Sequence, residues 1–120
     1  MTATIAVVLI VLVAVEHLYF LYLEMFAWTD ERTRKSFGTT LEFAQASKAL
    51  AANQGLYNGF LAVGLLHTVA GPFKNLHLAV LFLSFVIVAA LFGGATVNRR
   101  IFLIQGLPAI AAMVAVFLAL

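Results

Sequence analysis

The residues best suited to chemistry in this chain are two glutamates and a histidine in an otherwise apolar stretch. The segment VAVEHLYFLYLEMFAW, residues 13–28, contains Glu16, His17 and Glu24. On a helix of about 100° per residue, Glu24 lies about 80° and His17 about 100° from Glu16, so the three share one stripe. Carboxylates and an imidazole in an apolar setting are suited to proton transfer. We therefore predict that Glu16, His17 and Glu24 are catalytic residues.

A second group of polar side chains is predicted to bind a ligand near this stripe. The segment AANQGLYNGF, residues 51–60, supplies three amides and a tyrosine, and QGLPA supplies a further amide. These groups and the glutamates all fall within about 6–18 Å of the helix ends that carry most basic residues. Pro108 also removes a helical N–H and leaves a nearby carbonyl without its donor. The predicted ligand-binding residues are Tyr19, Asn53, Gln54, Tyr57, Asn58 and Gln105.

The energetics of charged groups in lipid separate the glutamates from the amides. An unsatisfied carboxylate near the centre of a bilayer costs on the order of 3 kcal/mol. Two glutamates on one helix therefore imply hydrogen-bonding partners, water or bound protons. A single buried amide is expected only to bind helices together, through hydrogen bonds that average about 0.6 kcal/mol. The combination of Glu16, His17 and Glu24 instead indicates a functional site.

The composition indicates a membrane protein. Of the 120 residues, 64% are hydrophobic and 10% are charged, whereas soluble domains carry about 25% charged residues. The net charge of +2 comes from scattered basic residues, which favours membrane lipids as partners and argues against nucleic acid. The chain has no cysteine and no Glu-x-x-His pairing, so we predict no metal site, and a cofactor remains undefined.

Four apolar segments have the length of a membrane-spanning helix, which needs about 20 residues. These segments are residues 3–28, 49–70, 76–97 and 101–120. The predicted fold class is therefore an all-α integral membrane four-helix bundle, with residues 1–120 as a single four-span domain. A short interfacial helix is also expected within residues 39–48, where apolar and polar side chains are interleaved.

Lysines and arginines predict how the four spans are oriented. The connections at residues 29–48 and 97–100 carry six of the seven basic residues, and Lys74 stands alone in the remaining connection. Because basic residues are retained on the cytoplasmic side, these two connections are expected to lie inside the cell. Both termini are then expected to face outward, an N-out/C-out arrangement.

Two glycines predict a close helix–helix contact. Gly55 and Gly59 form a G-x-x-x-G pattern, in which small residues let two helix backbones approach. The contact is expected either within one chain or between the protomers of a homo-oligomer.

The motifs EHLYFLYLEMFAW, AANQGLYNGFLA, FGGATV and QGLPA suggest a relationship. They resemble the signature segments of a bacterial family of small four-span integral membrane proteins catalogued as a domain of unknown function. The resemblance covers nearly the whole chain. It implies a four-helix fold in a bacterial inner (plasma) membrane, and it lends no established activity and no catalytic residue.

Three functions are compatible with these residues. In the first, a polar pocket in the cytoplasmic half binds a lipophilic small molecule, Glu16 and His17 exchange a proton with it, and Glu24 orients it. In the second, an embedded glutamate drives a proton-coupled small-molecule carrier, although the outer half of the spans offers few polar groups. In the third, the polar stripe docks an accessory or assembly subunit onto a larger membrane complex. We expect the first function, and whether the protein is an enzyme stays open.

Overall fold

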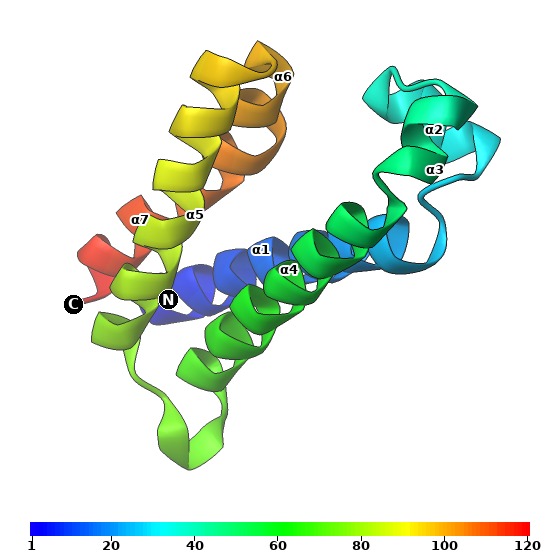
Figure 1. The fold of residues 1–120 in the computed structure, drawn as a ribbon. Coiled ribbons are helices and arrows are strands. Elements are labelled where there is room, and N and C mark those ends of the chain that lie inside the picture. The colour runs from blue at the N-terminus through cyan, green and yellow to red at the C-terminus, as the bar shows by residue number, and fades with distance from the viewer. The chain divides into compact units, whose positions relative to one another are not determined.

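The computed structural model describes residues 1–120, and it contains helices and no strand, which confirms the all-α prediction. The elements in chain order are α1 (Thr2–Phe26), α2 (Glu31–Phe37), α3 (Leu41–Ala46), α4 (Lys48–Val69), the 3₁₀ turn η1 (Gly71–Phe73), α5 (Leu76–Thr96), α6 (Arg99–Ile101), the π-helical turn η2 (Phe102–Gly106) and α7 (Leu107–Ala119) (Figure 1). The chain divides into two compact units, residues 1–16 with 61–120 and residues 17–60, so α1 and α4 contribute to both.

Three helices are long and apolar enough to cross a membrane. They are Thr2–Phe26, Leu76–Thr96 and Arg99–Ala119, the last of which comprises α6, η2 and α7. The structure thus supports three of the four expected spans, each within two residues of the predicted bounds. The fourth expected span, α4, has 22 residues but is not among them. Its first half carries Asn53, Gln54 and Asn58, which make it less apolar than the other three.

Apolar side chains from four helices form the core of the unit that comprises residues 1–16 and 61–120. Ile10 of α1, Leu65 of α4, Leu83 of α5 and Val116 of α7 are fully buried there. Small residues belong to the same cluster, and its fully buried alanines are Ala6, Ala14, Ala62, Ala79, Ala109 and Ala112. Small side chains allow close backbone packing, which is the main source of helix association where lipid replaces water.

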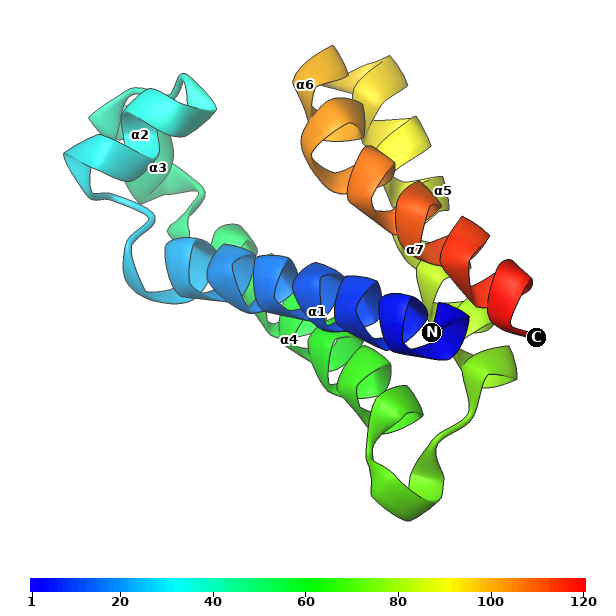
Figure 2. The same ribbon diagram turned by 180° about the vertical axis from the view of Figure 1, so that it is seen from behind.

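In the same unit, α5 and the C-terminal helix form a tight antiparallel hairpin, which Figure 2 shows from behind. Asn98 lies in the turn, and its side chain accepts a hydrogen bond of 2.9 Å from the backbone N–H of Arg100. Gly94 leaves room for Phe102, because a Cβ on Gly94 would lie 2.8 Å from the Phe102 Cβ. The hairpin therefore closes with only two residues, 97 and 98, between its helices.

The π-helical turn η2 lies directly before Pro108. Proline has no N–H, and its ring collides with the carbonyl four residues earlier in a regular α-helix. The wider turn, in which the N–H of Leu107 donates to the carbonyl of Phe102, relieves this collision. The disturbed bonding expected near Pro108 is therefore present as a single wide turn.

The unit of residues 17–60 contains the end of α1, the start of α4 and the segment that connects them. We call this connecting segment, Thr29–Ser47, the cap; it contains α2 and α3. Gly38 ends α2 with a φ of 67°, a left-handed conformation that glycine adopts without strain. Thr40 then starts α3, because its side chain accepts a 3.1 Å hydrogen bond from the N–H of Phe43. The short helix expected within residues 39–48 corresponds to α3, whereas α2 was not predicted.

The first prediction concerns the core of the larger unit. Leu83→Ala is expected to lower the free energy of unfolding by about 2–5 kcal/mol, because it leaves a cavity at a fully buried position. Val88→Ala on the same helix is the control, since Val88 is 64% exposed and should lose little packing. Thermal unfolding of both variants in the same detergent, followed by circular dichroism, measures the difference. Equal midpoints would show that Leu83 does not pack as described.

Candidate functional site

Within residues 17–60, α1 and α4 make their closest contact along the glycine face of α4. A Cβ placed on Gly55 would lie 2.7 Å from the Met25 Cγ, and one on Gly59 would lie 2.6 Å from the Leu21 Cδ1. Gly55 contacts Met25, whereas Gly59, four residues later in the chain, contacts Leu21, four residues earlier. The two helices are therefore antiparallel. The glycines therefore make a contact within one chain, which is one of their two expected roles. A homo-oligomer through the same glycines would require this contact to open.

Glu24 and Asn58 are the two predicted site residues that the structure joins directly. The Nδ2 atom of Asn58 donates a hydrogen bond of 2.5 Å to the Oε1 atom of Glu24. Asn58 is only 8% exposed, and Glu24 is half-buried. Gly55 lies about one turn before Asn58, and a Cβ there would come within 3.1 Å of the Glu24 Cβ. The missing side chain of Gly55 therefore sets how closely the carboxylate and the amide can approach.

Glu16 and His17 lie on α1 about two turns before Glu24. Glu16 is half-buried, and its Oε1 atom is buried and accepts no hydrogen bond. His17 is fully buried, with its ring edge-on to Phe20 at a centroid distance of 5.4 Å. Buried carboxylate oxygens normally have a donor. Glu16 is therefore a position at which a bound proton or a ligand hydroxyl would satisfy the carboxylate.

No hydrogen bond joins the other predicted ligand-binding residues to the Glu24–Asn58 pair. Tyr19, Asn53, Gln54 and Tyr57 are exposed, and Gln105 is half-buried in η2. The angular positions explain the difference. On the helical wheel, Asn53 lies about 160° from Gly55, and Tyr57 lies about 160° from Gly59. The glycine face packs against α1, so these two side chains point away from it.

The contacts of the glycines also show which residues of α1 and α4 lie side by side. Met25 lies level with Gly55, and the helices are antiparallel, so Asn53 and Gln54 lie level with the residues at the end of α1. The first turn of α4 therefore extends past the end of α1.

Two features of this part of the chain were not predicted. Leu21 and Met25 are the partners of the two glycines, and their spacing of four residues matches that of Gly55 and Gly59. That matching spacing was a usable signal in the sequence. The second feature is the hydrogen bond that the indole N–H of Trp28 donates to the Oγ of Ser47, at 3.0 Å. It joins residues 19 positions apart, and no local pattern indicates it.

The surface depression that most resembles a binding pocket lies on α2. It is an open depression lined by Glu31, Arg32, Lys35 and Ser36 of α2, and none of these is a predicted site residue. Exposed side chains of a single short helix form it, so we assign it no function. No three histidine or carboxylate side chains lie close enough together to hold a metal ion. The polar pocket expected along α1 and α4 therefore stays a proposal.

The fold is that of an all-α protein with three helices long and apolar enough to cross a membrane, and the Glu24–Asn58 hydrogen bond lies at the contact between α1 and α4. The chain belongs to the family described as "Protein of unknown function (DUF1304)", whose model matches residues 11–117. It is 36% identical over 113 residues to the "Uncharacterized protein YpaA" of Lactococcus lactis subsp. lactis (strain IL1403), covering 92% of this chain and 95% of that protein. No solved structure matches the chain. The expected membership of a family of unknown function is confirmed, and the match includes α1 from residue 11 and all of α4.

The second prediction tests the close contact at Gly55. Gly55→Leu is expected to destabilise the protein by about 1–3 kcal/mol, the usual cost of overpacking. The added side chain would meet Met25 and the backbone carbonyl oxygen of Leu21, which lies 3.2 Å from the Cβ position and cannot rotate away. Ala49→Leu is the control, because Ala49 is exposed on the same helix. Thermal unfolding of both variants in one detergent gives the comparison, and an unchanged midpoint for Gly55→Leu would contradict the contact.

Proposed function

We propose that this protein is a multi-pass protein of a bacterial inner membrane that binds a lipophilic small molecule and exchanges a proton with it. The hydrogen bond from Asn58 to Glu24 carries the proposal, because it holds a carboxylate at the contact between the apolar helix α1 and α4. A carboxylate is a costly way to join helices in lipid, where uncharged side chains make the same contact more cheaply. Its presence is better explained by a ligand or a proton that it binds.

Within this proposal, the polar residues of α1 have separate roles. Glu24, held by Asn58, orients the polar head of the ligand. Glu16 accepts a proton from the ligand through the buried Oε1 atom that has no donor, and His17 returns a proton. The ligand is thereby rearranged with no net gain or loss of protons. The exposed side chains of Tyr19 and Gln54 are proposed to hydrogen-bond the polar head, whereas Asn53, Tyr57 and Gln105 stay sequence predictions.

We also propose that α4 crosses the membrane, which gives four spans with both termini outward. Its polar side chains do not prevent this. Asn58 is bonded to Glu24, and the buried hydroxyl of Thr68 donates to a backbone carbonyl at 2.6 Å. Asn53 and Gln54 lie level with the end of α1, where water and headgroups are within reach.

The basic residues favour four spans over three. With four spans, the cap and the turn that contains Arg99 and Arg100 lie on the same side of the membrane. If α4 stayed on one side, that turn would lie on the side opposite the cap. Its two arginines would then be translocated, which the positive-inside rule disfavours.

The third prediction tests the topology. Fusions of a fluorescent protein that folds only in the cytoplasm, and of a phosphatase that is active only outside, are made after Ser36, Lys74, Asn98 and Leu120. The Ser36 and Asn98 fusions are expected to fluoresce, and the Lys74 and Leu120 fusions to show phosphatase activity. A fluorescent Lys74 fusion would show that α4 does not cross the membrane.

The fourth prediction tests the ligand. Glu24→Gln can still accept the hydrogen bond from Asn58, so its unfolding midpoint is expected to stay close to that of the unaltered protein. Co-purified lipophilic ligand should fall about tenfold or more, because a hydrogen bond to a charged group contributes about 1.5–3 kcal/mol and 1.4 kcal/mol is tenfold in affinity. Mass spectrometry of solvent extracts measures the bound ligand.

Glu42→Gln is the matched control for this experiment, since Glu42 is exposed on the cap. It should retain the ligand in full. Equal amounts of every lipophile in the Glu24→Gln and Glu42→Gln proteins would contradict ligand binding at Glu24. Uptake of a substrate into proteoliposomes with an accompanying change in internal pH would replace the proposed reaction with proton-coupled transport.

A further inference from the structure

The cap is fixed at the point where α1 ends. Trp28 lies two residues beyond the last residue of α1, and its N–H donates to the Oγ of Ser47, the last residue of the cap. The same ring packs edge-on against Phe37, with centroids 5.0 Å apart. Because α4 begins at the next residue, Lys48, no linker separates the cap from α4. A cap held in this way stays at the surface from which α1 enters the membrane.

The cap has its own small interior. Thr33 of α2 and Ala44 of α3 are buried, and so is Ala27, the residue after the end of α1. The Nε of Arg34 donates to the backbone carbonyl of Thr29 at 3.0 Å. The two short helices are therefore held in a defined arrangement, and the side chains that point outward from them are presented as a fixed surface.

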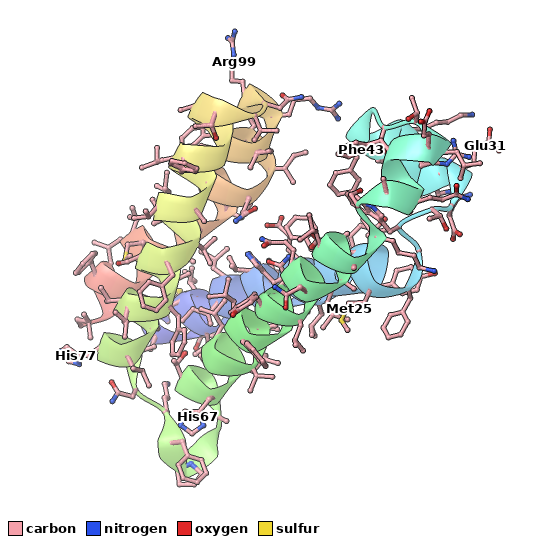
Figure 3. All side chains as sticks on the ribbon, viewed as in Figure 1. Met25, Glu31, Phe43, His67, His77 and Arg99 are labelled. Atoms are coloured by element: carbon pink, nitrogen blue, oxygen red, sulfur yellow. The ribbon has the colours of Figure 1, made fainter.

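Large apolar side chains are prominent on that surface. Phe37 and Leu41 are each 45% exposed, and Phe43 is 55% exposed. Figure 3 shows Phe43 and Glu31 projecting from opposite sides of the cap. Exposed phenylalanine and leucine side chains are unfavourable in water, and they are typical of elements that lie in the membrane interface.

The charges of the cap complement a layer of phospholipid headgroups. The cap and the adjacent Lys48 together contain four basic and three acidic residues. Arg32, Lys35 and Lys48 are exposed. The Nζ atom of Lys35 lies 3.4 Å from the Oε1 atom of Glu31. Headgroups likewise present phosphates beside positively charged groups, so exposed charges of both signs find partners in that layer. Trp28 is also of the residue type enriched at this depth.

From these contacts we propose that the cap rests in the phospholipid headgroup layer and inserts Phe37, Leu41 and Phe43 toward the acyl chains. Glu31, on the other side, faces water. The surface thus binds membrane lipid directly, independently of any ligand at Glu24. It also anchors the end of α1 at a fixed depth, because Trp28 connects the cap to that end.

Two labelled variants test this proposal, and the cysteine-free chain allows each label to be placed at one site. Phe43→Cys and Glu31→Cys are each labelled with a polarity-sensitive fluorophore and reconstituted into vesicles of phosphatidylcholine and phosphatidylglycerol. A spin label near the headgroup end of the acyl chain should quench the label at position 43 severalfold more than the label at position 31. Aqueous iodide should show the opposite order. Emission from Trp28, the single tryptophan, verifies that each cap is folded.

If neither the lipid spin label nor iodide quenches the label at position 43, protein covers this surface and the proposal is wrong. Equal quenching of the two labels by iodide in vesicles would also overturn it. Leu41→Cys is the second probe if Phe43→Cys fails to fold, and the same quenching order is expected.

Discussion

The close approach of α1 and α4 at Gly55 and Gly59 is the contact on which the candidate site depends. Helices with larger side chains between them pack with their axes about 8–10 Å apart. Here a Cβ atom placed on Gly55 or Gly59 would lie within 3 Å of a side-chain atom of Met25 or Leu21, respectively. At this contact the short amide of Asn58 reaches the carboxylate of Glu24. The glycines determine the geometry, and the polar pair makes use of it.

The arrangement of polar groups shows why a helical wheel finds a site only in part. The wheel places Glu16, His17 and Glu24 on one stripe of α1, and Glu24 is indeed at the contact with α4. On α4 the wheel groups Asn58 with Asn53, although only Asn58 lies at that contact. In lipid, close backbone packing drives association more strongly than polarity does. The small residues therefore decide which side of α4 faces α1, and an amide contributes only if it lies near them.

Long apolar helices were predictable because their lengths and breaks are local properties of the sequence. The bounds of α1 and α5, and the turn at Asn98, agree with the prediction to within a few residues. The wide turn η2 results from Pro108, because proline has no N–H and its ring collides with the carbonyl four residues earlier in a regular α-helix. The cap was less predictable, because its fold depends on Trp28 meeting Ser47 across 19 positions. Such a contact requires knowledge of the tertiary structure.

The Glu24–Asn58 hydrogen bond gives the order of synthesis a role in assembly. Helix α1 leaves the ribosome first and is apolar enough to partition into lipid unaided. Helix α4 is less apolar, and in the proposed four-span topology its entry is favoured by Glu24, which can accept a hydrogen bond from the amide of Asn58. The cap keeps the two helices near each other during the interval between them. In the proposed topology, a chain made in this order would insert α4, the least apolar of its four long helices, as the second arm of a helical hairpin whose first arm is α1.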